Sequence, residues 1–474
     1  MAESTTEIRQ LIRADRTQPD SAAVAHVLTG TLFLAVGAVA AALALLSMSF
    51  TGFIPLGYGV WRAIAMLGLL VGFGTLTLTG GAYYVLPRLT GARLWNEPFA
   101  WLGLVITAAT TAAGMVVVAV GLGDGREPFG LPWWLDLPLL AGLGIPPLVA
   151  LSTLRNRTES QTFVTIPFVV TGLAGLPLVY LAGNIPGLAP VASTVGDLFS
   201  GSAYVVLLLS IAIGLGHYAV VKQTEKPLAG RQLSHIAYWS LLFGAGWFGI
   251  AQIAGGPTPD WLGVIGAVLG LGLPVGLVAA SANLLATLEG KWRDNDHVEP
   301  VAMLSVAGLF FGTVLAIPAA LAGFRSTGNL VAFTPYWEGV VYGFALGVLP
   351  LLSGAVLIQA IPKMTGRDIY SQQAAARTVR LIVYGTGALV VFLVAAGLVA
   401  GYSWAGGSFT GAFNAVGEGW PAATGPSRGF LGVGSFAGIV GALGALSLVS
   451  LVLRTLTEGP VTTQEVLVVA KEEE

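Results

Sequence analysis

Long apolar runs recur along the whole chain and are separated by short polar segments. A helix rises about 1.5 Å per residue, so roughly 20 apolar residues cross a hydrocarbon core of about 30 Å. Twelve runs reach this length, and the pattern predicts an all-α membrane protein, a bundle of twelve transmembrane helices. The predicted spans are 24–48, 59–86, 98–122, 133–153, 162–183, 197–221, 235–254, 261–288, 301–323, 334–361, 379–402 and 429–453.

The distribution of basic residues supports this layout. With both termini in the cytoplasm, 18 of the 22 basic residues fall in cytoplasmic segments, an asymmetry typical of correctly counted spans. The sequence therefore predicts an integral protein of the plasma (cytoplasmic) membrane, with cytoplasmic tails at 1–22 and 455–474 and one membrane domain at 23–454. The first apolar run is too long for a signal peptide and is predicted to be retained. The four exceptions are Arg62, Arg126, Arg325 and Arg428.

Composition narrows the function classes. Hydrophobic residues make up 55% of the chain and charged residues only 10%, too few to coat a water-facing surface, so the lipid bilayer is the main partner. The 65 glycines suit close packing of membrane helices. A net charge of −2 gives no basis for nucleic-acid binding. With no cysteine, the chain itself forms no disulfide, thiolate metal site or iron–sulfur cluster.

Related helix endings recur every four spans. Span 2 ends with Leu86-Pro87-Arg88-Leu89-Thr90-Gly91, span 10 with Ile361-Pro362-Lys363-Met364-Thr365-Gly366, and span 6 more weakly at Lys222, without the proline. The basic residues Arg88, Lys222 and Lys363 are 134 and 141 residues apart. Proline is expected to stop each helix, and the base to anchor it at the headgroups. This repeat predicts three four-helix units in a pseudo-threefold arrangement about an axis along the membrane normal.

Several helix-end motifs together resemble subunit I of the heme–copper oxidase superfamily, in particular the C-type cytochrome c oxidases and the large subunit of nitric oxide reductases. The resemblance covers nearly the whole chain and implies a respiratory electron-transport protein with twelve helices. It rests on Tyr83–Arg88 in span 2, Gln232–Ser234 and Tyr238-Trp239 in span 7, Pro259–Trp261 and Asn283–Thr287 in span 8, and Gly339, Pro362, Gly366, Tyr370 and Ser371 in and after span 10.

The family resemblance implies six histidines that bind two hemes and a copper or iron ion. At the corresponding positions this chain has no histidine, and most of the residues present are small and apolar. We therefore predict no heme, copper or other metal in this chain, and expect side chains, shifted helices, lipid or a quinone to fill the former heme space. The six positions are Ala65 in span 2, Gly201 in span 6, Ala251 and Gln252 in span 7, and Val340 and Tyr342 in span 10.

Other polar residues offer little alternative chemistry. The four histidines are placed near cytoplasmic helix ends or in an inner loop. His217 and His235 could approach each other as ligands across neighbouring helices, but both are interpreted as interfacial residues with exposed tips. Glu338 and Asp197 are the only acidic residues expected near the core, and both are also interpreted as interfacial, like Arg62. Gln252, Gln359 and Asn283 are expected to form interhelical hydrogen bonds. The histidines are His26, His217, His235 and His297.

Three functions follow from these patterns. The leading hypothesis is a non-catalytic core or docking subunit, a pseudoenzyme that works with other subunits of a respiratory or redox membrane complex. The second is a catalytic terminal cytochrome c oxidase or nitric oxide reductase, which the absent ligands oppose. The third is a channel or a transporter that binds quinone or lipid. Few charges lie in the spans, which argues against ion transport but not against an apolar ligand.

Overall fold

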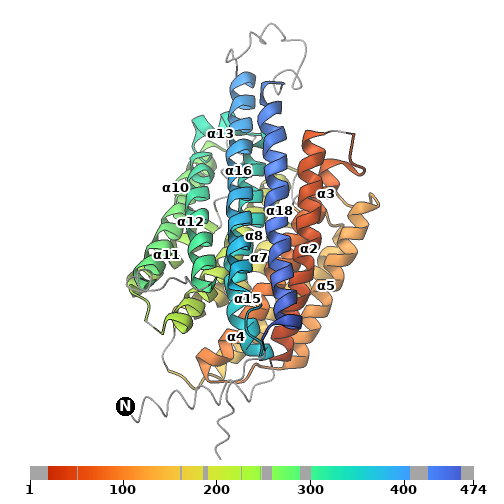
Figure 1. The fold of residues 1–474 in the computed structure, drawn as a ribbon. Coiled ribbons are helices and arrows are strands. Elements are labelled where there is room, and N and C mark those ends of the chain that lie inside the picture. Colours follow the sequence, from red (N-terminus) through yellow and green to blue (C-terminus); the bar gives the residue numbers. More distant parts are fainter. Residues whose placement is uncertain are drawn as a thin grey trace, which may run out of the picture.

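The computed structural model of the chain describes residues 20–50, 52–126, 128–160, 163–184, 190–225, 227–245, 247, 259–288, 300–405 and 425–460, with the backbone alone for residues 190–201, 224 and 245. The described residues form long helices joined by short connections (Figure 1). Residues 406–424, between the last two predicted spans, and most of both predicted tails lie outside this part of the chain.

Helices account for nearly all of the described chain, and π-helical segments interrupt two of them. Each long helix is an apolar run of the kind predicted from sequence. The elements are α2 (Ser21–Ser49), α3 (Gly57–Met66), η1 (Leu67–Thr75), α4 (Leu76–Thr90), α5 (Glu97–Ala119), α6 (Trp133–Arg155), α7 (Thr165–Gly183), α8 (Pro190–Thr224), α9 (Arg231–Ala245), α10 (Asp260–Gly270), α11 (Gly272–Leu288), α12 (Pro300–Leu321), α13 (Arg325–Val331), α14 (Pro335–Tyr342), η3 (Gly343–Val348), α15 (Leu349–Thr365), α16 (Gln372–Trp404), η5 (Gly425–Ser427) and α18 (Arg428–Glu458).

Eleven helical stretches among the described residues are long and apolar enough to cross a membrane, which confirms an all-helical membrane protein. Most of their ends agree with the predicted spans to within about five residues, but α16 begins seven residues before the predicted start at 379. The predicted span 235–254 coincides with α9 over residues 235–245 and then enters residues outside the described part. The predicted span 197–221 is longer in the structure, since α8 begins at Pro190.

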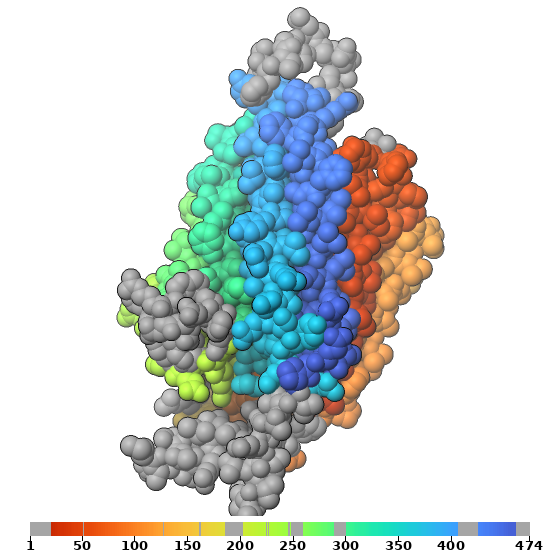
Figure 2. Space-filling model, viewed as in Figure 1, coloured from red at the N-terminus to blue at the C-terminus, as the bar shows by residue number. Residues whose placement is uncertain are grey.

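The helices stand side by side in one elongated bundle (Figure 1). We call the end at which α2 begins and α18 ends the terminal end, and the opposite end the distal end. At the terminal end the N–H of Asp368, just before α16, donates to the carbonyl of Pro460, just after α18, at 2.8 Å. Along their length α16 and α18 pack against each other, and Figure 2 shows them as neighbouring columns beside α2.

Burial separates an inner ring of helices from an outer ring. In α3–η1–α4, α8 and α14–η3–α15, the most apolar stretches are 94%, 89% and 100% buried, against 39–61% in the other candidate spans. The inner three are therefore apolar on all sides and enclosed by protein, whereas the outer helices turn one face to lipid. They are spans 2, 6 and 10, the same three that share the repeated ending.

The repeated helix endings have the same geometry in spans 2 and 10. Gly91 after α4 and Gly366 after α15 both adopt a left-handed backbone, with φ of 67° and 69°. The hydroxyls of Thr90 and Thr365 each donate to the carbonyl four residues earlier, at 2.8 Å. The expectation that proline stops these helices is wrong, because both continue about one turn past it. Glycine ends them, since it enters the left-handed region without a steric cost.

Candidate functional site

Four of the six positions at which the family resemblance implies metal ligands lie in the inner helices, and the structure describes the side chains of three of these. Ala65 in α3 and Tyr342 in α14 are 0% exposed, and Val340 in α14 is 1% exposed. Only the backbone is described at Gly201 in α8, while Ala251 and Gln252 lie outside the described residues. The described positions in α3 and α14 therefore lie in the interior of the bundle, where the resemblance implies that the hemes bind.

A π-helical segment follows these positions in both spans. The segment η1 begins two residues after Ala65, and η3 begins directly after Tyr342. A shift of 275 residues, which superposes Pro87 on Pro362, places η3 at residues 68–73, inside η1. Such π segments are rare and often mark functional sites. The repeat seen in the helix endings therefore extends through the whole of spans 2 and 10.

The residues at these positions do not fit an iron porphyrin. Alanine and valine have no lone pair for iron, and an axial bond from Tyr342 would need a porphyrin face beside its oxygen. At 0% exposure, neither Ala65 nor Tyr342 borders even a water-sized gap. Nearby, α2 lies directly on η1, because a Cβ added to Gly68 would be 2.6 Å from the Cα of Gly37. Ala65 and Val340 thus offer no donor atom, and no space for a heme borders Ala65 or Tyr342.

An ion pair joins spans 2 and 10 at the distal end. The Nε of Arg62 donates to both carboxylate oxygens of Glu338, at 3.0 and 3.2 Å. Their side chains are only 12% and 18% exposed, and the interpretation of both as interfacial residues did not foresee that they pair. The buried hydroxyls of Tyr58 and Tyr342 lie within electrostatic reach of both charges. We call Tyr58, Arg62, Glu338 and Tyr342 the distal polar cluster.

Apolar side chains fill the centre of the inner ring in two layers. A Cβ added to Gly74 would lie 2.9 Å from methyl carbons of both Leu208 and Leu349. One layer further, a Cβ on Gly81 would lie 2.8 Å from Val356 and 2.9 Å from Leu215. Within each layer the three residues are 134 and 141 apart, the spacing of the repeated basic residues. Equivalent positions of spans 2, 6 and 10 therefore meet, and the glycine admits two larger side chains.

The histidines are arranged differently from the sequence interpretation. His26 and His217 are each 1% exposed, so the expectation of an exposed tip is wrong for His217. His26 packs edge-on against Tyr83, and its Nδ1 lies 2.7 Å from the carbonyl of Ala22. His217 packs on Phe168, and neither ring nitrogen has a hydrogen-bond partner within the described chain. His235 is exposed, as expected, and His297 lies outside the described residues.

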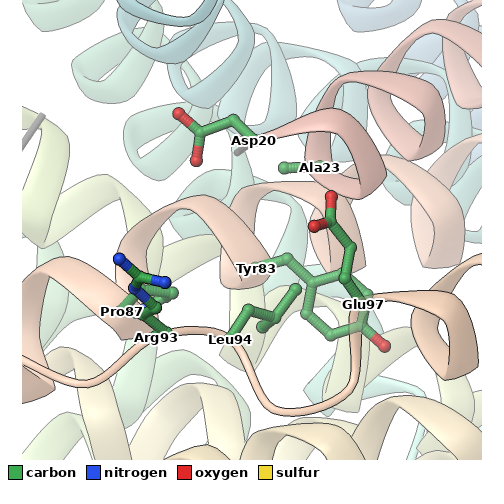
Figure 3. A pocket seen from close by; sticks show the side chains of 7 residues that line it. All are labelled: Asp20, Ala23, Tyr83, Pro87, Arg93, Leu94 and Glu97. Carbon is green, nitrogen blue, oxygen red and sulfur yellow. The ribbon is translucent and has the colours of Figure 1, made fainter. Parts of the chain in front are cut away.

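No group of three or more potential metal-binding side chains occurs among the described residues. A small cavity of about 170 Å³ does open at the terminal end, between α2, α4 and the start of α5. Its acids already have partners: Asp20 pairs with Arg88 at 2.8 Å, and Glu97 accepts from the N–H of Ala22 at 3.2 Å. Figure 3 shows the residues that line it, which are Asp20, Ala23, Tyr83, Pro87, Arg93, Leu94 and Glu97.

Polar residues of the family-like motifs tie neighbouring helices together. Asn283 in α11 donates to the hydroxyl of Ser234 in α9 at 2.6 Å and accepts from the N–H of Gly230 at 2.9 Å. The hydroxyl of Thr287 accepts from the N–H of Ala229 at 3.1 Å. The prediction that Asn283 forms interhelical hydrogen bonds is confirmed. These motif residues fix how α9 and α11 pack and carry no reactive group into the core.

Sequence reasoning missed a buried acid in span 4. Asp136 in α6 is 8% exposed, and the hydroxyl of Tyr180 in α7 donates to its carboxylate at 2.5 Å. The available signal was a single carboxylate within the predicted span 133–153, one turn from its start. The sequence pattern pointed to Asp197 instead, a residue for which the structure describes the backbone alone.

Comparisons with known proteins agree with this architecture. The family model described as cytochrome c and quinol oxidase polypeptide I matches residues 21–423. A cryo-EM structure of a heme–copper terminal oxidase dimer has the same fold, with a TM-score of 0.75 at 14% identity over 93% of this chain and 84% of that one. The protein is an all-helical membrane bundle, and it belongs to the heme–copper oxidase subunit I family.

Individual relatives are distant. The chain is 25% identical to cytochrome c oxidase subunit 1 of Rhodobacter capsulatus over 376 residues, covering 74% of this chain and 68% of that protein. It is 22% identical to the cbb3-type cytochrome c oxidase subunit CcoN1 of Stutzerimonas stutzeri over 330 residues, covering 66% of this chain and 68% of that one. With the cytochrome c oxidase subunit 1 homolog of Agrobacterium tumefaciens, the match spans 61% of the relative's length.

Proposed function

We propose that this protein is a non-catalytic core or docking subunit of a respiratory or redox membrane complex. The proposal rests on the residues at the family ligand positions of spans 2 and 10, which are Ala65, Val340 and Tyr342. No water-sized gap lies beside Ala65 or Tyr342. An oxidase needs imidazole nitrogens at such positions to hold iron and copper. The distal polar cluster supports the proposal, because an ion pair joins the two spans that a heme would bridge.

The rest of the proposed architecture follows the sequence repeat. We place twelve spans in three four-helix units about a pseudo-threefold axis, with both termini in the cytoplasm, and the two apolar layers of the inner ring support this axis. In this arrangement the terminal end of the bundle is cytoplasmic. The outer helices then offer their lipid-facing sides to partner subunits that carry the cofactors.

Optical spectroscopy and metal analysis of the purified, full-length protein test this function. The protein is produced in cells that make heme and contain copper, with an authentic cytochrome c oxidase subunit I as the matched control. We expect less than one-tenth of an equivalent of heme or copper per chain, and no reduced-minus-oxidised heme spectrum. A stoichiometric heme with the spectrum of histidine-ligated iron would overturn the proposal, and oxygen or nitric oxide reduction by the isolated chain would establish the enzymatic alternative.

A further inference from the structure

The small cavity at the terminal end contains charged groups that the proposed function does not use (Figure 3). Its volume of about 170 Å³ is more than ten times the roughly 15 Å³ that a single water molecule needs. Ala23, Pro87 and Leu94 form an apolar part of its lining, and the other lining residues are polar. A cavity with both kinds of lining suits a ligand that has a charged part and an apolar part.

One carboxylate of the cavity is neutralised and the other is not. The guanidinium of Arg88 donates to both carboxylate oxygens of Asp20, at 3.0 and 2.8 Å. Glu97 uses only Oε1, which accepts from the hydroxyl of Ser21 and the N–H of Ala22 at the start of α2. Its Oε2 accepts no hydrogen bond from the described residues. Glu97 can therefore bind a cation without breaking the contacts that join α2 to α5.

The lining also includes a positive charge. Arg93, in the connection between α4 and α5, is exposed and forms no ion pair within the described part of the chain. Figure 3 shows its guanidinium apart from the carboxylates of Asp20 and Glu97. Because Asp20 is already neutralised, the cavity presents one acid and one base at separate places. This arrangement complements a zwitterion better than it complements an anion or a cation.

A buried hydroxyl in the lining lacks a hydrogen bond as well. Tyr83 in α4 is 1% exposed, and its hydroxyl has no partner among the described residues. His26 of α2 packs edge-on against its ring, with the ring centres 5.1 Å apart, and so restrains the ring. A buried hydroxyl without a partner costs free energy, and a ligand oxygen in the cavity would satisfy it.

Two tryptophans place the cavity at the depth of the lipid headgroups. Trp95 and Trp101 lie on either side of Glu97 in the sequence and are 37% and 40% exposed. Tryptophan concentrates at the membrane–water interface, because its ring is largely apolar and its N–H is polar. Further along α5, Leu102 and Val105 are 47% and 57% exposed, as expected of a helix face that contacts acyl chains.

We propose that this cavity binds the headgroup of one phosphatidylethanolamine molecule. The ammonium of the lipid donates to Oε2 of Glu97, its phosphate accepts from the guanidinium of Arg93, and another of its oxygens accepts from the hydroxyl of Tyr83. The acyl chains lie on the exposed face of α5. Phosphatidylcholine has no N–H to donate and phosphatidylglycerol has no cation, so either would leave Oε2 of Glu97 unsatisfied. The site is independent of the proposed docking role.

Native mass spectrometry of the full-length protein in detergent tests the site. The protein is mixed with equal amounts of phosphatidylethanolamine, phosphatidylcholine and phosphatidylglycerol that carry the same acyl chains, and the bound lipids are identified by mass. We expect one phosphatidylethanolamine to bind about tenfold more tightly than either other lipid, the factor that one charge-assisted hydrogen bond supplies. Soluble glycerophosphoethanolamine, which has the headgroup without acyl chains, should compete at least a hundredfold more weakly.

Three variants and a control locate the bound lipid. Glu97→Gln keeps an oxygen for the hydrogen bonds at the start of α2 but loses the charge, so the preference for phosphatidylethanolamine over phosphatidylcholine should disappear. Arg93→Gln should weaken the binding of both lipids about tenfold, because both carry a phosphate. Tyr83→Phe should weaken binding about threefold at an unchanged melting temperature, since its hydroxyl has no partner to lose among the described residues. Arg157→Gln, which changes an exposed arginine outside the cavity lining, should have no effect.

Several outcomes would overturn the proposal. The first is equal binding of the three lipids to the unaltered protein, and the second is a preference for phosphatidylethanolamine that persists in Glu97→Gln. Equal losses in Arg93→Gln and Arg157→Gln would show a general attraction of lipid phosphates to basic residues instead of a site. Displacement of the lipid by an equal concentration of glycerophosphoethanolamine would show that the cavity serves a soluble ligand.

Discussion

Arg62 and Glu338 bring opposite charges together at the distal end of the bundle, where both side chains are mostly buried and each charge alone would be costly. Their side chains are largely shielded from water, so the attraction is screened less than at a surface. The energetic asymmetry of such pairs is well defined: loss of one partner leaves an unpaired charge, whereas replacement of both by apolar residues removes the desolvation cost as well. Sequence alone assigned both residues to the interface, because 276 positions separate them and no local pattern reveals the pairing.

Glu338→Gln should therefore destabilise the protein more than the double change Arg62→Met with Glu338→Leu. For the single variant we expect a loss of about 3 kcal/mol, toward the lower end for buried pairs because this one is partly exposed. Thermal unfolding in detergent, followed by circular dichroism, measures both. Asp260→Asn is the control, since its pair with Arg325 is 74–82% exposed and should contribute about 0.5 kcal/mol or less. Equal losses in the Glu338 and Asp260 variants would contradict a structural role for the distal polar cluster.

At the scale of elements, the inner ring depends on glycines that allow close approach. Gly74 lies where Leu208 of α8 and Leu349 of α15 both press on span 2, and any larger side chain must displace them. The repeat spacing found in sequence already related these three positions. The repeat spacing did not reveal that these residues are in contact. Contact depends on the rotation of each helix about its axis, and the weak apolar periodicity of these spans does not define that rotation.

Gly74→Val should consequently cost about 1–3 kcal/mol through overpacking. Gly216→Val is the matched control, because Gly216 is a buried glycine of α8 with open space around its added Cβ. Adding Leu208→Ala to Gly74→Val should recover part of the loss, and a double-mutant cycle from thermal unfolding gives the coupling energy. If the two changes are simply additive, Gly74 and Leu208 do not share a layer.

The helix ends show what local sequence can and cannot decide. Gly91 and Gly366 were visible as the last residues of a repeated motif, and each ends its helix with a positive φ. The prolines before them were expected to end the helices. They do not, because a proline in the last turn removes one backbone donor while the remaining carbonyls are satisfied by caps such as the Thr90 hydroxyl. Competition between two helix-ending signals is settled by geometry that the sequence does not encode locally.

At the scale of the whole molecule, the fold was predictable because lipid imposes strong constraints on the sequence. Span length, charge asymmetry and the family-like motifs agree on an all-helical bundle, and the structure confirms it for the described residues. The candidate sites were less predictable. Asp136 and Tyr180 are in different spans and pair through tertiary packing, as do the rings of Phe129 and Tyr180. Sequence shows which residues are present, but which of them come into contact depends on how the helices are rotated and packed.

The docking role also depends on whether the space for a heme is closed. Variants that restore histidine ligands test this closure separately from the loss of the histidines. In the double variant Ala65→His with Tyr342→His, imidazole returns to one family ligand position in span 2 and one in span 10. Because Ala65 and Tyr342 are 0% exposed, an added imidazole at residue 65 has no room, and overpacking there should cost about 1–3 kcal/mol. We expect lower thermal stability and no low-spin heme spectrum after expression with excess heme. Ala65→Val is the control for bulk alone. A stoichiometric bis-histidine spectrum at unchanged stability would mean that spans 2 and 10 still open to admit a porphyrin, and that substitution of the ligands alone removed the cofactor.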